Sequence, residues 1–546
     1  MAAVAILAAK FFLAGRINVN WDEFYFLSHV YALARGELDI FLQGAYTHAF
    51  LWITGTGGDE VDQIVRLRLA MCALLAASAA LIYALARQWS SRPAAMVAVL
   101  AWLATWPVIK HGASFRADAL LLPLTMAAFW IALRPDRSGW RNAAIAGSCI
   151  GFAFAVSVKA LLLLPALAFM ATLPDAARDG SGSPAASARW RRLLMVFVAA
   201  VPVAAVLLAW HGTQLETRGE PLGRLDSGVL ATAMLDLPLA PRRDYFRVLA
   251  SEDALYGAAL VAGLFVAVRR RFYAAIASLL ALAPVLFYRN AFPYYYPIML
   301  APTAVLVALA ADRLFAIESR RWSKPAAIAV AAACVAWMAA AYDRVMTLRF
   351  DGQASQRAIV AAVHRVFAEP VSYVDHSGMI ASFPQVNFLM SSWGVDAYLR
   401  RGRDFMPAAI AGRCPPLVLV DHPVLIPGTL LYRRLRETDR RLLETRYVGH
   451  WGPIRVAGVQ AELDTGARVT IRVPCPGAYR LEASAPVVFG GAVHGDGDVL
   501  VLEGERDYRL EAARPTIERT RVRLIWAAAH SPPPEPPPAS GLYDSL

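Results

Sequence analysis

Long apolar runs recur along the chain up to about residue 345, and they constrain its fold more than any other feature. A transmembrane helix needs about 20 mostly apolar residues, and soluble domains do not contain so many runs of this kind. The chain is 58% hydrophobic and 18% charged, against about 45–50% and about 25% in soluble domains. We therefore expect a polytopic α-helical membrane protein that crosses the bilayer about eleven times. The runs are 1–17, 64–86, 93–109, 117–133, 142–158, 160–174, 193–211, 254–268, 272–288, 292–311 and 325–342.

The first run is expected to be a transmembrane helix and not a cleaved signal peptide. Residues 1–17 lack a basic segment and an obvious small-residue cleavage site, and Lys10 interrupts the run. The N-terminus then lies on the same side of the membrane as every second loop.

Basic residues in alternate short loops predict the orientation. With eleven spans, the five basic loops all fall on one face, which the positive-inside rule places in the cytoplasm. We expect a cytoplasmic N-terminus and a periplasmic C-terminal domain, in a bacterial inner (plasma) membrane. Because the arginines gather in these loops, the net charge of +12 does not indicate a nucleic-acid partner. The loops carry Arg87 and Arg92; Arg134, Arg137 and Arg141; Arg178, Arg189, Arg191 and Arg192; Arg269, Arg270 and Arg271; and Arg313, Arg320, Arg321 and Lys324.

The chain is expected to have a transmembrane domain, a soluble domain and a tail. The transmembrane domain, 1–345, carries outward loops 18–63 and 212–253, and the first loop contains an amphipathic stretch suited to the membrane interface. Residues 346–530 are expected to form a mixed α/β domain, and the proline-rich tail 531–546 an extended, disordered end. A helical pattern covers 353–367, and strand patterns cover 371–375, 416–421, 467–473 and 499–502.

The five cysteines divide between these parts. Cys72, Cys149 and Cys334 lie in apolar runs, where they are expected to be small core residues. Cys414 and Cys475 lie in the C-terminal third, each next to a proline. They could form one disulfide if this domain faces an oxidising compartment.

An acidic pair, Asp22 and Glu23, directly follows the first apolar run. Adjacent carboxylates at a membrane surface can accept a proton from an incoming hydroxyl or bind a divalent metal ion. Acidic residues at an interface can equally be solvated without any function. Two acids alone do not decide between these interpretations.

Ionisable residues also occur at two outward turns. The first contains Lys110, Arg116 and Asp118. Its cations can extend to the interface, whereas Asp118 must pair or line a wet cavity, and Arg116 is its nearest candidate partner. Lys159, alone between two apolar runs, marks either a tight outward turn or a deep site for an anion.

Arg289 precedes a tyrosine-rich segment that includes Tyr294 and Tyr295. This segment is either an aromatic belt at the interface or a phosphate clamp in which arginine and tyrosine hydroxyls donate hydrogen bonds. All candidate residues are expected on the outer face. They suit a substrate with a lipid-borne phosphate, which the cations hold while a carboxylate deprotonates an acceptor hydroxyl.

The order of these motifs resembles that of the GT-C membrane glycosyltransferases, in the branch of protein O-mannosyltransferases and lipid A aminoarabinose transferase. The resemblance covers residues 15–310. It departs from the family pattern near His48, where a proline pair is absent, and around Lys159, where threonine and glycine are replaced. The matching motifs are Asp22-Glu23, Tyr46 to Trp52, Arg116 to Asp118, Val158 to Ala160 and Tyr294 to Pro297.

The resemblance implies an enzyme that transfers a sugar from a polyprenyl phosphate to an acceptor hydroxyl, with inversion, on the outer face of the membrane. The acceptor would be a lipid, a glycan or a protein, and a divalent metal is possible because some relatives use one. Asp22 would be the base and Glu23 its helper, and these two would also be the metal ligands. The other implied residues are Lys159, Arg289, Tyr295, Lys110 and Arg116 for the donor phosphate, and Asp118, His48 and Tyr294 for the sugar or acceptor pocket.

Two other classes of protein compete with this interpretation. A transporter or flippase for a lipid-linked saccharide would use the same outward charges, but the sequence shows no internal repeat to support it. A non-catalytic receptor or scaffold would tolerate loss of Asp22.

Overall fold

The computed structural model divides the chain into two compact units, which are described separately. Unit 1 comprises Met1–Ile17, Leu33–Gly55 and Val65–Arg349; unit 2 comprises Asn18–Ala32, Thr56–Ile64 and Phe350–Leu546. Two segments of the first outward loop thus belong with the C-terminal domain, whereas the hydropathy pattern assigns the whole loop to the transmembrane domain. The structure describes all residues except 135–138, 174–185, 216–242, 289–290, 317–322, 349–351, 465–466, 514–518, 539–541 and 544–546.

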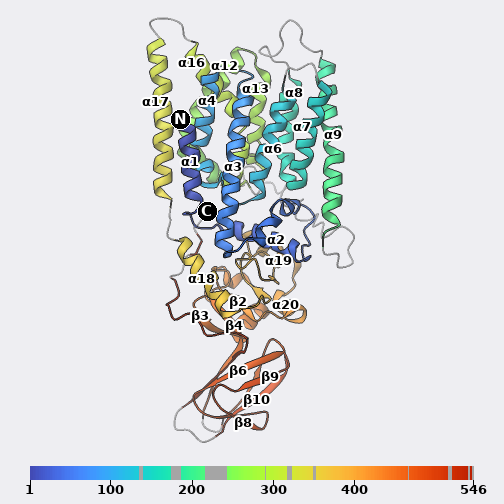
Figure 1. Cartoon of the computed structure of the whole chain (residues 1–546), viewed down its shortest axis with the longest axis vertical. Helices are drawn as coiled ribbons and strands as arrows, with labels where there is room; N and C mark the ends of the chain where they lie inside the picture. Colours follow the sequence, from blue (N-terminus) through green and yellow to red (C-terminus); the bar gives the residue numbers. More distant parts are fainter. Residues whose placement is uncertain are drawn as a thin grey trace. The chain divides into compact units, whose positions relative to one another are not determined.

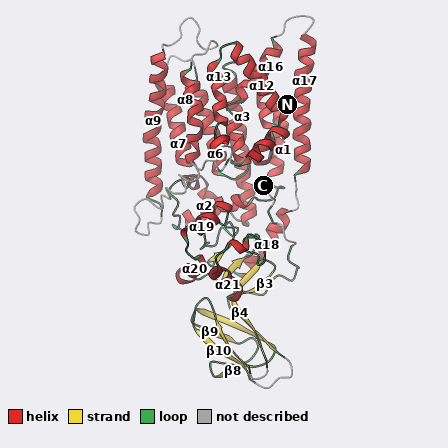
Figure 2. Ribbon diagram, turned by 180° about the vertical axis from the view of Figure 1, so that it is seen from behind, coloured by secondary structure: helices red, strands yellow, loops and turns green. Residues whose placement is uncertain are grey.

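Unit 1 is built of helices, and its long helices run in similar directions in both views (Figures 1 and 2). The helix α3 begins in unit 2 and continues through unit 1. The elements are α1 (Ala2–Ala14), η1 (Ala45–Gly55), α3 (Glu60–Ala86), α4 (Arg92–Leu103), α5 (Trp106–His111), α6 (Ala117–Ala132), α7 (Gly139–Val156), η2 (Val158–Leu163), α8 (Leu164–Thr172), α9 (Ala186–Gly212), α11 (Arg243–Glu252), α12 (Ala254–Arg269), α13 (Tyr273–Ala277), η3 (Ser278–Leu282), α14 (Pro284–Phe287), η4 (Pro293–Tyr295), α15 (Tyr296–Leu300), α16 (Ala304–Phe315) and α17 (Ser323–Thr347).

Several of these helices are suited to a bilayer. In the described part of the chain, 3 helices are long and apolar enough to cross a membrane: Glu60–Ala86, Ser187–Gly212 and Lys324–Thr347. The helices Pro293–Leu300 and Ala304–Phe315 meet at 52° and could together form a fourth span, and shorter apolar helices of 10–17 residues accompany them. The protein is therefore a polytopic membrane protein, and the count of about eleven spans stays a prediction.

Small residues let the helices of unit 1 approach each other closely. A Cβ atom at Gly147 would overlap the carbonyl oxygen of Val196, and one at Gly151 would overlap that of Ala200. The two glycines are one turn apart on α7 and both face α9, which is the small-xxx-small pattern of helix pairs in membranes. Gly263 brings α12 against α16 in the same way.

Unit 2 combines helices with two β-sheets (Figure 2). The larger sheet has the order β1-β2-β4-β11-β6-β9, with β3 also paired to β4, and the smaller has the order β5-β10-β7-β8. The strands β1 and β2 are parallel, whereas β11 runs antiparallel to both β4 and β6. The helices are α2 (Trp21–Ala34), α18 (Gly352–Val366), α19 (Ser392–Arg401), α20 (Phe405–Arg413), η5 (Tyr432–Arg434) and α21 (Glu437–Thr445). The strands are β1 (Tyr373–Val374), β2 (Leu417–Leu419), β3 (Tyr447–Trp451), β4 (Ile454–Leu463), β5 (Arg468–Arg472), β6 (Gly477–Ala483), β7 (Val487–Phe489), β8 (Ala492–His494), β9 (Val499–Leu502), β10 (Asp507–Ala512) and β11 (Thr520–Trp526).

The local sequence patterns in the C-terminal domain are confirmed. The predicted helix corresponds to α18, and the four predicted strands correspond to β1, β2, β5 and β9. In β9 the side chains of Leu500 and Leu502 are buried while Val499 and Val501 are exposed. This alternation places one face of the strand on the core.

A disulfide joins Cys414 and Cys475, whose Cα atoms are 5.5 Å apart. The pairing considered from the sequence is therefore confirmed. Cys414 follows α20 and Cys475 follows β5, so the bond ties the helical part of unit 2 to its sheets. The structure also records Cys72, Cys149 and Cys334 as free cysteines.

The described part of the proline-rich tail makes side-chain contacts with other segments of unit 2. The Trp451 indole Nε1 donates to the backbone carbonyl of Glu535 at 3.0 Å. Just before the tail, the His450 Nε2 lies 2.8 Å from the carbonyl of His530. The prolines remove backbone donors from this segment, and the carbonyl of the intervening Glu535 still accepts a hydrogen bond.

Candidate active site

Five of the predicted site residues meet in one buried cluster of unit 1, which we call the ionic cluster. The Lys159 ammonium lies 3.1 Å from Asp118 Oδ1, and Arg116 Nε lies 3.5 Å from Asp118 Oδ2. The Arg116 guanidinium lies 3.5 Å from the centroid of the Tyr294 ring, and Lys159 Nζ lies 4.2 Å from that of Tyr295. The side chains of Arg116, Asp118 and Lys159 are only 6%, 5% and 12% exposed. One carboxylate therefore holds two cations, each of which also faces an aromatic ring.

Three interruptions of helices position the ionic cluster. Arg116 and Asp118 lie at the start of α6, Lys159 lies in η2 between α7 and α8, and the two tyrosines lie in η4 before α15. The Ser157 hydroxyl caps η2 by accepting a hydrogen bond from the Lys159 N–H at 3.4 Å. Pro293 begins η4, as expected for a residue without an N–H and with a fixed φ.

A strained glutamine borders the ionic cluster and was not predicted. Gln43 has a φ of 64°, in the left-handed region that residues other than glycine seldom adopt. Its side-chain Oε1 lies 3.4 Å from the hydroxyl of Ser157. Backbone strain of this kind persists where the surrounding structure enforces it, often at functional sites. Because glutamine has no special preference for this conformation, the sequence carries no signal for it.

His48 contacts His211, a second residue that the sequence motifs did not reveal. The His48 Nε2 lies 2.9 Å from His211 Nδ1, and His211 Nε2 lies 2.9 Å from the carbonyl of Ile40. A carbonyl only accepts, so His211 carries its proton on Nε2 and His48 donates from its own Nε2. Burial and the neighbouring His211 lower the pKa of His48 to about 4. His48 is therefore a neutral hydrogen-bond donor near neutral pH. The only hint of His211 in the sequence is that it is a polar residue at the end of the apolar run 193–211.

The structure places two of the four predicted cations, Arg116 and Lys159, in the ionic cluster. The Lys110 ammonium instead lies 5.2 Å from the centroid of the Trp106 ring, on the same helix α5. Arg289 lies outside the described residues. Its predicted role at the donor phosphate therefore stays a proposal.

The acidic pair begins helix α2 in unit 2. Asn20 Oδ1 accepts a hydrogen bond from the Asp22 N–H, and Glu23 Oε2 accepts one from the Asn20 N–H, each at 2.9 Å. This reciprocal pattern is a capping box, in which both side chains satisfy backbone donors of the first turn. Asp22 and Glu23 are both buried. Glu23 thus has a structural role in the first turn, and the described residues contain no group of 3 or more side chains suited to a metal ion.

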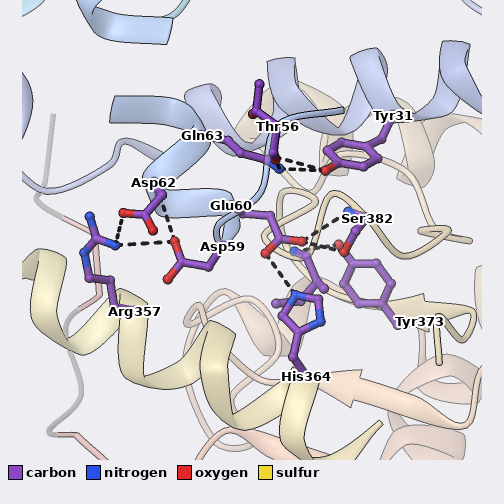
Figure 3. A network of polar contacts seen from close by, with 11 residues as sticks. Tyr31, Thr56, Asp59, Glu60, Asp62, Gln63, Arg357, His364, Tyr373 and Ser382 are labelled. Atoms are coloured by element: carbon purple, nitrogen blue, oxygen red, sulfur yellow. Dashed lines mark hydrogen bonds and ion pairs between the residues drawn. The ribbon is translucent and has the colours of Figure 1, made fainter. Parts of the chain in front are cut away.

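A polar network in unit 2 joins the first turn of α3 to α18 (Figure 3). The Ser382 hydroxyl donates to Glu60 Oε1 at 2.6 Å, and His364 Nε2 lies 3.0 Å from Glu60 Oε2. Beside it, Arg357 pairs with Asp62 at 2.5 Å. Burial lowers the pKa of His364, but the hydrogen bond and charge of Glu60 outweigh burial and leave this pKa above 6.5.

Comparison with known proteins gives a family match and a shared fold. Residues 51–210, which include Arg116, Asp118 and Lys159, match the family model of dolichyl-phosphate-mannose-protein mannosyltransferase. No curated protein sequence matches the chain. ArnT from Cupriavidus metallidurans has a similar structure, with a TM-score of 0.52 at 14% sequence identity over 76% of this chain and 91% of that protein.

Two more distant structures also resemble the chain. The Archaeoglobus fulgidus oligosaccharyltransferase has a TM-score of 0.45 at 12% identity, over 88% of this chain and 73% of its own. The arabinosyltransferase EmbB from Mycobacterium smegmatis has a TM-score of 0.39 at 13% identity, over 97% of this chain and 63% of its own. Residues 51–210 therefore resemble the mannosyltransferase family, and the chain shares its fold with ArnT.

Proposed function

We propose that the protein transfers a sugar from a polyprenyl-phosphate donor to a hydroxyl of a lipid, glycan or protein acceptor. The observation that carries this proposal is the ionic cluster, in which Asp118, Arg116 and Lys159 are buried together. Ionisable groups in a membrane domain are costly, and they mark sites that bind polar or charged substrates. The family match over residues 51–210 supports a lipid-linked sugar as the donor.

The charge of the ionic cluster fits one phosphodiester. Arg116 and Lys159 carry two positive charges and Asp118 one negative charge, so these three side chains together have a net charge of +1. A sugar linked to polyprenyl phosphate carries one negative charge, whereas a diphosphate-linked sugar carries two. An ammonium has three N–H donors and a guanidinium five, so each cation can hold Asp118 and also bind a phosphate oxygen. The cluster therefore favours a monophosphate donor.

In the proposed reaction, the bond between the anomeric carbon and the phosphate oxygen breaks as the acceptor oxygen bonds to the same carbon. Asp22 accepts the proton of the acceptor hydroxyl, and Glu23 keeps the first turn of α2 in place through the capping box. Arg116 and Lys159 stabilise the negative charge that develops on the departing polyprenyl phosphate. Attack opposite the leaving phosphate inverts the anomeric centre.

The remaining predicted residues keep supporting roles in this proposal. The rings of Tyr294 and Tyr295 orient the two cations, and Asp118 sets their spacing. His48 is a neutral hydrogen-bonding residue for the sugar or acceptor pocket. Lys110 and Arg289 are proposed as additional ligands of the donor.

We propose that transfer takes place on the periplasmic side of a bacterial inner membrane. The disulfide between Cys414 and Cys475 supports this orientation, because disulfides persist in oxidising compartments outside the cytoplasm. The arginine-rich loops support it independently through the positive-inside rule. Unit 2, which contains Asp22, would then face the periplasm.

The test of this function uses the purified full-length protein, a labelled polyprenyl-phosphate sugar and a hydroxyl acceptor. Lys159→Met should lower kcat/KM for the donor about 100-fold, since it removes a donor to the developing phosphate charge. Lys159→Arg should retain part of the activity. Lys324→Met, in a loop expected to be cytoplasmic, is the matched control and should leave kcat/KM unchanged. Movement of the donor across the bilayer without sugar transfer would identify a flippase and contradict the proposal.

A further inference from the structure

One glutamine of α18 clamps the chain just before α2. Gln356 Oε1 accepts a hydrogen bond from the Val19 N–H at 2.8 Å, and Gln356 Nε2 donates to the Val19 carbonyl at 2.7 Å. The same Nε2 also donates to the carbonyl of Leu542 at 2.9 Å. Gln356 is fully buried, so water does not compete for these bonds. The side chain of Gln356 therefore joins the residues just before α2 to the segment near residue 542.

Two edge-on ring contacts hold the first turn of α2. The Trp21 ring meets the His376 imidazole with centroids 5.3 Å apart. The Phe24 ring meets Tyr543 in the same way at 6.4 Å. Such pairs have a preferred geometry and so restrict how the helix can rotate. The two rings flank Asp22 in the sequence.

The two residues whose rings contact α2, His376 and Tyr543, are held in turn by other residues of unit 2. The Tyr543 hydroxyl donates to Asp421 Oδ2 at 2.7 Å. The His376 ring stacks on His422 at 3.7 Å, and its backbone N–H donates to Asp421 Oδ1 at 3.4 Å. Burial, followed by the charge of Asp375, raises the pKa of Asp421 well above its usual value. This part of unit 2 is thus a buried polar layer in which both ring partners of α2 are anchored.

A glycine in the same loop sets how closely α2 can approach. Gly378 has a φ of 79°, and a Cβ atom there would lie 2.7 Å from the side chain of Ser28. Asp375 shapes this loop by accepting hydrogen bonds from the N–H groups of Gly378 at 2.8 Å and Met379 at 2.7 Å. The loop therefore contacts α2 one turn beyond the two rings.

We propose that Gln356, His376 and Tyr543 form a seat that holds α2 and thereby positions the carboxylate of Asp22 for proton transfer. The three are positioning residues, and the inference rests on the proposed function, in which Asp22 is the base. A displacement of about 1 Å at a reacting group can lower a rate about 100-fold, so the support of a base matters as much as its identity. Residues 542 and 543 are then part of the machinery of transfer, although they lie more than 500 positions after Asp22.

The test compares three variants of the full-length protein in detergent or lipid nanodiscs. Tyr543→Leu removes the ring contact and the hydrogen bond, Tyr543→Phe keeps the ring, and Gln356→Met removes the backbone clamp. Tyr508→Leu is the matched control, because Tyr508 stacks on Phe489 elsewhere in unit 2. The readouts are hydrogen exchange of the amides at 18–34 and the kcat and KM for the labelled donor.

For Tyr543→Leu and Gln356→Met we expect exchange at 18–34 to accelerate about tenfold while β6 and β11 stay protected. In both variants we expect kcat to fall about tenfold, while KM for the donor stays within about twofold of the wild-type value. Tyr543→Phe should retain most of the wild-type kcat. Unchanged exchange at 18–34, or faster exchange with unchanged kcat, would overturn the inference. If the wild type transfers no sugar at all, the proposed function fails, and the exchange data still decide whether the seat exists.

Discussion

Asp118 is the residue on which the ionic cluster depends, because its carboxylate lies between two buried cations. Asp118→Asn leaves Arg116 and Lys159 close together without this counter-charge. Removal of one partner of a buried ion pair costs about 3–5 kcal/mol. We therefore expect this variant to unfold at a markedly lower temperature and to lose sugar transfer. Thermal unfolding of the purified protein in detergent measures the first effect.

The control for this prediction is Asp312→Asn. Asp312 also faces an arginine, but its side chain is 19% exposed and lies 3.9 Å from Arg270. Partly exposed pairs contribute about 1 kcal/mol or less, so this variant should unfold close to the wild type. Equal unfolding temperatures for the two variants would show that Asp118 does not balance the buried cations.

Asp22 and Glu23 are neighbours in sequence, and the proposed function gives them different roles. Asp22→Asn should lower kcat about 100-fold to 10,000-fold and leave donor binding intact, because it removes the proposed base. Glu23→Gln should change kcat less than about threefold, because glutamine also completes a capping box. Turnover and binding of a labelled polyprenyl-phosphate sugar measure both effects. Undiminished turnover of Asp22→Asn would exclude it as the base.

At the scale of residues, the sequence could identify individual ionisable groups but only part of their pairing. Arg116 was the expected partner of Asp118, since the two are close in the chain, and the structure confirms this contact. The shorter contact, from Lys159, comes from another helix end and had no local signal. The capping box of Glu23 was not predicted, although Glu23 follows Asn20 by three positions, which is the spacing of this motif. His211 could not be assigned because its partner lies far away in the chain.

At the scale of elements, local patterns predicted helices and strands well but not their neighbours. The pattern at 499–502 matches β9, and that at 353–367 matches α18 within a residue at each end. In contrast, nothing in the sequence places β11 between β4 and β6. Alternation of apolar residues identifies a buried face, whereas strand order depends on contacts between distant segments.

The packing of α18 against the start of α3 makes the stability of unit 2 depend on pH. The pKa of His364 is raised because its bond to Glu60 outweighs burial. The stabilisation from this pair is complete below the unfolded pKa of 6.5 and is lost as the pH rises through the raised folded pKa. Because the imidazole is 38% exposed, we expect a loss below about 1 kcal/mol between about pH 6 and about pH 8.

His364→Gln should remove this part of the pH dependence, as measured by denaturant unfolding of the full-length protein. Ser382→Ala is the control, because it removes another hydrogen bond to Glu60 without removing a titrating group. Ser382→Ala should lower the free energy of unfolding by the same amount at about pH 6 as at about pH 8. If the stability of His364→Gln still falls between these pH values, a group other than His364 causes the pH dependence.

At the scale of the whole molecule, hydropathy predicted the class of protein, and contacts between distant segments define its two compact units. The predicted boundary near residue 346 lies close to Phe350, where the last segment of unit 2 begins. Unit 2 nevertheless includes Asn18–Ala32 and Thr56–Ile64, which come from the loop after the first apolar run. A hydropathy profile cannot show this, because the contacts responsible, such as Val19 with Gln356, join polar segments far apart in the chain.

The disulfide between Cys414 and Cys475 tests both the stability of unit 2 and the side of the membrane it faces. It closes a loop with a sequence separation of 61, so its removal is expected to cost about 4 kcal/mol. The double variant Cys414→Ser and Cys475→Ser should therefore unfold at lower denaturant, whereas Cys334→Ser, which removes a free cysteine, should not. Thiol labelling of the denatured, non-reduced protein should modify Cys334 but neither Cys414 nor Cys475. Because such bonds form outside the cytoplasm, labelling of both in protein from intact cells would contradict the periplasmic placement as well as the bond.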